Sequence, residues 1–143
     1  MTLEDIVSTI KGIAADNFSN YSCIFESWED AGTALDRASL PAIVVVLPVA
    51  GSFTIRNGRI YDTTNIAVAF VDKVRRTANG DDNHAVTQSQ KNNAAQFLGY
   101  LNSSGVTERL DLVTYSLIYE RKSSIITGIY MDIQLTTSQG ACL

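Results

Sequence analysis

The side chains that most often carry chemistry are scarce in this sequence. It has one histidine, His84, and two cysteines, Cys23 and Cys142, which lie far apart and form no CxxC pair. A reactive thiolate needs a neighbouring base or cation, and a zinc site needs three or four ligands. Cys23 has no histidine or basic residue beside it, which favours the role of a small buried apolar side chain. These residues therefore predict neither a nucleophile nor a zinc site.

One carboxylate pair, Asp81 and Asp82, follows Gly80 and resembles the aspartate pair of some metal-dependent polymerases. Here it stands at the start of an expected helix, where acidic side chains interact favourably with the helix dipole. Capping is therefore favoured over metal binding. The sequence also lacks GxSxG, GxGxxG after a strand, a P-loop and HExxH. We expect no enzyme, cofactor or metal site, with carboxylates that meet from distant loops as the open alternative.

Composition narrows the possible partners. The 143 residues carry a formal net charge of −4 and have a pI near 4.8, which disfavours a nucleic-acid binder held by phosphate contacts. Charged residues make up 18% of the chain, below the usual quarter, which indicates that part of the surface contacts protein. There is no signal-peptide pattern, and the longest apolar run, 42–47, is too short for a membrane span. We expect a protein made in the cytoplasm with reduced cysteines.

Hydrophobic periodicity predicts the elements that would position a site. An apolar stripe at helical spacing begins near Leu3, and a second helix is expected over 84–102. Asn57-Gly58 between strand-like residues predicts a type I′ hairpin. Pro48 is expected to end the strand that precedes it. Strands are predicted over 21–27, 42–47, 53–55, 60–62, 64–74, 113–119 and 125–136.

The stretch 64–74 is the expected central strand, because both of its faces are apolar. In the last strand, Ile129, Met131 and Ile133 are predicted to face a core shared with the N-terminal helix. Residues 1–143 should thus form a single α+β domain, with one mixed, mainly antiparallel sheet and two helices packed on one face. The predicted order is α-β-β-hairpin-α-β-β.

Several segments are candidates for subunit or partner contacts. Residues 28–40 lack periodicity, and Trp28 at their start could anchor an interface or pin the loop to its own core. The amide-rich first half of the second helix, 87–93, could be wet or could hydrogen-bond a neighbouring subunit. Basic residues at the hairpin and after the central strand are expected to dock on acidic patches of neighbouring protein subunits. The candidate interface residues are Trp28, Glu29, Asp30, Arg56, Arg59, Lys73, Arg75, Arg76, Gln88 and Lys91.

The run of elements has a counterpart in a known family. An N-terminal amphipathic helix is followed by LPAIVVVLP, a hairpin, TTNIAVAFVDKV, a helix ending in AAQFLGYL, and the late strand SIITGIYMDIQLTTSQGAC. In this order the chain resembles the tail-terminator and tail-completion proteins of tailed bacteriophages, which form small rings at the head-proximal end of the tail. The resemblance covers most of the chain, apart from 28–40.

This resemblance implies a structural virion protein in the tail or neck. It would form a homo-oligomeric ring of six subunits that stacks on the tail-tube protein, stops its polymerisation and meets the neck and head-completion proteins. DNA would only pass through the ring, and no membrane would be involved. Two alternatives stay open: a head–tail adaptor of the neck, and a small enzyme or ligand-binding domain with its site beside 28–40.

Overall fold

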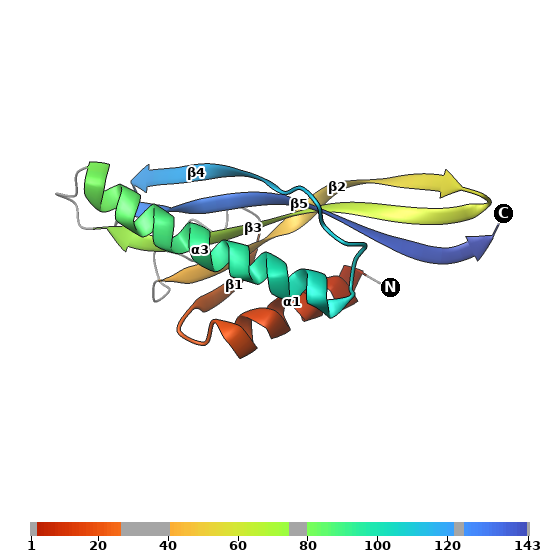
Figure 1. Cartoon of the computed structure of the whole chain (residues 1–143), viewed down its shortest axis with the longest axis horizontal. Coiled ribbons are helices and arrows are strands. Elements are labelled where there is room, and N and C mark those ends of the chain that lie inside the picture. The colour runs from red at the N-terminus through yellow and green to blue at the C-terminus, as the bar shows by residue number, and fades with distance from the viewer. Residues whose placement is uncertain (1–2, 27–40, 75–79, 122–124, 143) are drawn as a thin grey trace.

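The computed structural model describes residues 3–26, 41–74, 80–121 and 125–142. They form an α+β structure with a mixed sheet, as predicted, and Figure 1 shows its elements. The described elements are α1 (Leu3–Asn17), β1 (Ser22–Glu26), β2 (Ala42–Arg56), β3 (Arg59–Val74), α3 (Gly80–Ser104), β4 (Thr114–Arg121) and β5 (Ile125–Cys142). The strand order is β1-β2-β3-β5-β4. Among the described strands, only β1 and β2 run parallel, and the other pairs are antiparallel.

The β2–β3 hairpin is longer than predicted. Its turn is confirmed, because Asn57 and Gly58 both have positive φ, 53° and 74°, as a type I′ turn requires. The prediction that Pro48 ends a strand is wrong. β2 continues past it, and the register with β3 shifts between Val46 and Ala50. A proline cannot donate a ladder hydrogen bond, so an irregularity at this position lets the strand continue.

β3 lies between β2 and β5, and both of its faces are buried, which confirms it as the central strand. Its even-numbered residues join a cluster that also includes both helices, and its odd-numbered residues join a second cluster on the opposite face of the sheet. The first set is Ile66, Val68 and Phe70, and the second is Ala67, Ala69 and Val71.

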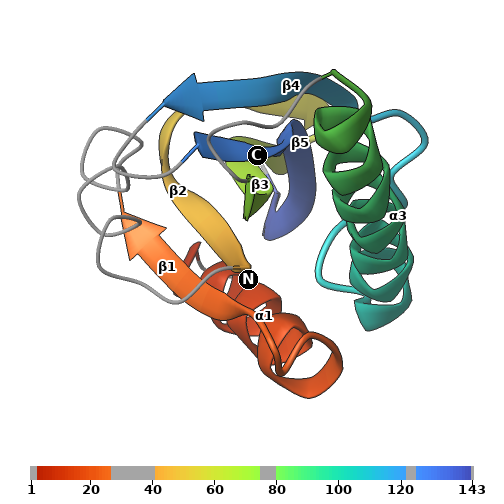
Figure 2. The same cartoon turned by 90° about the vertical axis from the view of Figure 1, so that its left-hand side faces the viewer.

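Both helices contribute to one hydrophobic cluster against the same face of the sheet, as Figure 2 shows. Ile10 of α1 and Phe97 of α3 are fully buried there. Ile129, Met131 and Ile133 of β5 belong to this cluster too, so the predicted inward face of the last strand is confirmed. Aromatic rings stack edge-to-face through it, since Phe70 contacts the rings of Phe18, Tyr21 and Phe97 with centroids 5.5–5.7 Å apart.

The far halves of β2, β3 and β5 extend past the helices as a three-stranded ribbon (Figure 1). No helix covers this ribbon in the described structure, so large side chains on it meet water. Phe53 is 72% exposed and Ile55 is 61% exposed. The ribbon therefore projects from the helix-covered body of the protein and carries two exposed apolar side chains.

Candidate functional site

Potential metal ligands are not gathered in the described part of the fold. His84 is exposed on α3, and no group of three or more histidine, cysteine, aspartate or glutamate residues lies close enough to hold a metal ion within the described ranges. Asp81 and Asp82 fall in the first turn of α3, at the helix start predicted for them.

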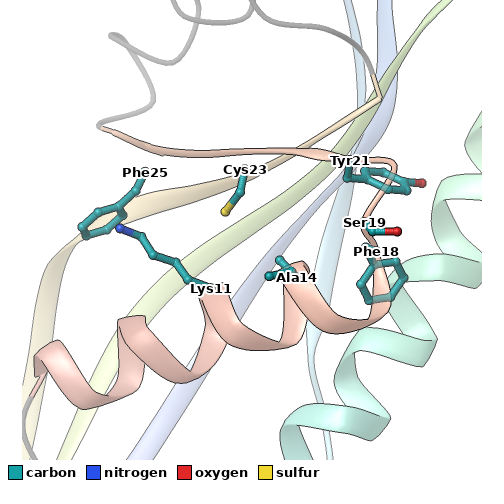
Figure 3. Close-up of a pocket in the computed structure, with 8 residues that line it drawn as sticks. Lys11, Ala14, Phe18, Ser19, Tyr21, Cys23 and Phe25 are labelled. Carbon is teal, nitrogen blue, oxygen red and sulfur yellow. The ribbon is translucent and has the colours of Figure 1, made fainter.

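A hollow lies between α1 and β1 (Figure 3). It has a volume of about 510 Å³. Its walls combine apolar side chains with one cation, and the Nζ atom of Lys11 lies 4.6 Å from the centroid of the Phe25 ring. Such a cation–π contact holds the lysine head group at the mouth of the hollow. The lining residues are Lys11, Ala14, Ala15, Phe18, Ser19, Tyr21, Cys23 and Phe25.

Cys23 points into this hollow, and its predicted role as a buried apolar side chain is wrong, because the residue is exposed. The physical reason is that β1 is an edge strand of the described sheet, and α1 is the one described helix that packs beside it on this side. Partial burial raises the pKa of the Cys23 thiol, and the nearby positive charge of Lys11 offsets only part of that rise. The thiol is therefore protonated at neutral pH and is a poor nucleophile.

The amide-rich half of α3 turns partly inward. The Tyr21 hydroxyl donates to Oε1 of Gln90 at 2.8 Å and accepts from Nδ2 of Asn93 at 2.6 Å. Gln90 is almost completely buried. These amides therefore bind the α1–β1 connection of their own chain. Partial burial of the ring raises the pKa of Tyr21, although both amide contacts act in the opposite direction.

Two predicted interface residues lie on the outer face of α3. Gln88 is exposed and donates from Nε2 to Oδ1 of Asn92 at 2.9 Å. Lys91 is exposed and places Nζ 5.2 Å from the ring centroid of Tyr115 on β4. The structure thus separates the polar side chains of this helix into inward amides and outward residues, of which Lys91 lies next to β4.

The two hairpin arginines face each other across the turn at the end of the ribbon. Arg56 stacks over the Tyr61 ring at 4.1 Å and forms an exposed ion pair with Glu108, with an N–O distance of 3.5 Å. Such an exposed pair contributes roughly 0–1 kcal/mol, so it leaves Arg56 able to exchange partners. Arg59 is exposed beside it. The structure therefore brings these two predicted residues together.

For the remaining predicted interface residues the structure describes no side chain. Lys73 lies near the end of β3, where its backbone pairs with Ile126. The other five lie outside the described residues: Trp28, Glu29, Asp30, Arg75 and Arg76.

One apolar surface was missed by the sequence reasoning. β4 is the other edge strand of the sheet, and Tyr115, Leu117 and Tyr119 on it are each about half exposed. Leu112, just before the strand, is 83% exposed. Alternation marked Tyr115, Leu117 and Tyr119 as sharing one face, but only the position of β4 at the sheet edge leaves that face uncovered. We refer to Leu112, Tyr115, Leu117 and Tyr119 as the β4 edge surface.

No protein-family model and no curated protein matches this sequence. Neither helix in the described part of the chain is long and apolar enough to cross a membrane.

Proposed function

We propose that this protein is a ring-forming structural subunit of a tailed-phage virion, a tail terminator that caps the tail tube and joins it to the neck. The observation that carries the proposal is the projecting ribbon of β2, β3 and β5. It places exposed Phe53 and Ile55 next to Arg56 and Arg59, away from the helix-covered body. Apolar surface flanked by charge is typical of a docking site for another protein.

The ribbon suits an axial contact. A hairpin that projects from the body can reach a ring above or below its own, and its exposed cations would meet acidic side chains there. Arg56 already forms an ion pair with the carboxylate of Glu108. The same guanidinium can therefore pair with a carboxylate of an adjacent ring. Exposed Phe53 and Ile55 would supply the area that is removed from water on docking.

The β4 edge surface suits a lateral contact within a ring. Large apolar side chains on an open sheet edge favour association with another protein chain. A ring of identical subunits needs two different patches on each subunit, because each copy contacts two neighbours in a head-to-tail way. The sheet has two different edges, β1 and β4. The proposed ring has six subunits, stacks on the tail-tube protein and lets DNA pass through its centre.

The proposal is tested with purified protein. Mass photometry and negative-stain images should show a closed ring of about six subunits, and the rings should cap one end of tail tubes assembled from the tube protein of the same phage. A matched variant, Phe53→Ser with Ile55→Ser, should still form rings and should cap tubes poorly. A protein that stays monomeric at all concentrations and does not bind tubes would refute the proposal.

The second candidate function is a head–tail adaptor of the neck. It would use the same ribbon for docking, with the ring at another axial level. The capping experiment separates the two functions. Rings that bind a portal complex and leave tube ends free would favour the adaptor, whereas rings that bind tube ends favour the terminator.

A further inference from the structure

The tip of the β2–β3 hairpin carries an asparagine that is open to attack by its own backbone. Asn57 is exposed, and Gly58 follows it. The side-chain amide carbon of an asparagine can react with the backbone nitrogen of the next residue, and a side chain on that next residue hinders the approach. Gly58 has no side chain, so its nitrogen reaches the Asn57 amide without this obstacle.

The turn makes no use of the Gly58 N–H. Arg56 and Arg59 are the pair that closes the hairpin. The hydrogen bond that closes a two-residue turn joins the outer residues, from the N–H of the fourth residue to the carbonyl of the first. In this turn those groups belong to Arg59 and Arg56. The turn therefore leaves the Gly58 nitrogen available as a nucleophile once it loses its proton.

The charges beside the turn favour that loss of a proton. Arg56 and Arg59 directly flank the Asn57-Gly58 pair and are both exposed. A positive charge nearby favours the ionised form of a group that becomes negative on deprotonation. The two guanidinium groups therefore act in the direction of the anionic Gly58 amide.

The other described asparagines lack this combination. The backbone amides that follow Asn17 and Asn20 donate to carbonyl oxygens at 3.0 and 2.9 Å. Asn65 precedes the β-branched Ile66 in the central strand. Inside α3 each backbone amide donates to the carbonyl four residues back, which occupies the amides after its asparagines. The asparagines of α3 are Asn83, Asn92, Asn93 and Asn102.

We propose that Asn57 is a site of spontaneous deamidation that changes the charge of the hairpin tip. The Gly58 nitrogen forms a bond to Cγ of Asn57, the bond from Cγ to Nδ2 breaks, and ammonia leaves with the proton that Gly58 gave up. The product is a five-membered succinimide. Water then opens the ring at either of its carbonyl carbons, which yields an aspartyl or an isoaspartyl residue at position 57. The reaction needs no reagent except water.

The two products act differently on the hairpin. An aspartyl residue before Gly58 still suits a type I′ turn, so it keeps the backbone and adds one negative charge between Arg56 and Arg59. An isoaspartyl residue adds a methylene group to the backbone. Turn type and loop length set the register of a hairpin, so this product should disturb the pairing at the tip. The effect on docking rests on the proposed function, whereas the reaction itself does not.

Peptide mapping tests the modification. The full chain is incubated at neutral and at mildly alkaline pH, digested with chymotrypsin and analysed by mass spectrometry, with an unincubated sample as the background. The peptide 54–61 has Asn57 as its one asparagine. It should gain about one mass unit, faster at the higher pH, because the deprotonated nitrogen is the nucleophile. Asn92 and Asn93 should keep their amides over the same period.

The same incubation in urea is the control for the role of the fold. An Asn57 amide that survives in the folded protein but is lost from the unfolded chain would show that the turn protects it, and would overturn the proposal. Loss from Asn92 and Asn93 at the rate seen for Asn57 in the folded protein would also overturn it. Asn79, the other asparagine before a glycine, lies outside the described residues and is assigned separately by fragmentation.

Two variants measure the effect on docking. Asn57→Asp reproduces the charge of the aspartyl product, and Asn57→Gly is the neutral control, because Gly-Gly also suits a type I′ turn. Asn57→Asp should raise the ring concentration that caps half of the tube ends by up to about fivefold, the range of an exposed charge interaction. Asn57→Gly should leave it unchanged. Equal capping by both variants refutes the effect on docking, and rings that cap no tubes refute the proposed function without touching the mapped deamidation.

Discussion

Tyr21 and Asn93, 72 residues apart in the sequence, are joined by a hydrogen bond of 2.6 Å from the side-chain amide to the hydroxyl. The same hydroxyl donates to Gln90, so one oxygen ties the α1–β1 connection to two residues one turn apart on α3. Since Gln90 is almost fully buried, the contact satisfies a polar group that water cannot reach. It holds the two helices in fixed positions over the sheet.

Tyr21→Phe should lower the free energy of unfolding by about 1–3 kcal/mol at neutral pH, because it leaves the Gln90 and Asn93 amides without this partner. Chemical denaturation measures the change. Tyr100→Phe is the matched control, since Tyr100 is exposed on α3, and it should change stability little. Equal stability of Tyr21→Phe and the parent would show that the hydroxyl contact contributes nothing net.

The dependence of stability on pH gives a second test of the Tyr21 contact, again by comparing the parent with Tyr21→Phe. The pKa of Tyr21 is raised in the folded protein, chiefly by burial. The stability this contributes is complete below the ordinary tyrosine pKa near 10 and is lost as the pH rises through the folded value, because the unfolded chain ionises first. The stability difference between the parent and Tyr21→Phe should therefore stay constant up to about pH 9 and shrink above about pH 10. A difference that grows over this range would contradict the assignment.

Two buried threonines should respond in opposite ways to the same substitution. Thr87 is buried with no hydrogen-bond partner for its hydroxyl in the described structure, whereas the buried Thr127 hydroxyl donates to Oδ1 of Asn83 at 2.6 Å. Thr87→Val should raise the free energy of unfolding by about 1 kcal/mol, because it removes an unsatisfied polar group. Thr127→Val should lower it by about 1–3 kcal/mol. Denaturant titrations of both variants measure the effects, and the same sign for both would refute the argument.

Met131→Asp should prevent soluble folding. Met131 is 2% exposed in the cluster shared with both helices, and an unpaired carboxylate at such a site costs several kcal/mol. Gln134→Asp is the matched control, because residue 134 lies on the same strand and is exposed. The yield of soluble protein and the melting temperature measure both effects. A Met131→Asp variant that melts like the parent would show that the inward face of β5 is wrongly assigned.

Gly128 on β5 should not tolerate a methyl group. A Cβ atom there would clash with the carbonyl oxygen of Phe70 and lie 2.8 Å from the Cα of Val71, so the backbone of β3 would have to move. Gly128→Ala should lower the free energy of unfolding by about 1–3 kcal/mol. Gly99→Ala on α3 is the control, because its Cβ would meet no atom within 4 Å, and it should stabilise the protein by about 0.5–1 kcal/mol. Thermal melts compare the two, and a neutral Gly128→Ala would contradict the close approach.

The sequence by itself determined the features that depend on near neighbours in the chain. Side chains alternate across a strand with period two, so the two faces of β3 and the inward residues of β5 follow from residue type alone. The positive φ values at Asn57 and Gly58 are likewise a local preference of that dipeptide. Pro48 shows where local patterns fail. Its residue type predicts the end of a strand, but a register shift against β3 lets β2 continue past it.

Only the tertiary structure decided which surfaces stay open. Alternation shows that Tyr115, Leu117 and Tyr119 share a face, but the exposure of that face depends on β4 being an edge strand, which follows from pairing with β5 rather than from its own residues. Cys23 is exposed for the same reason at the opposite edge. The hydrogen bonds of Tyr21 to α3 join segments about 70 residues apart, and the energy of such contacts depends on packing that no local pattern encodes.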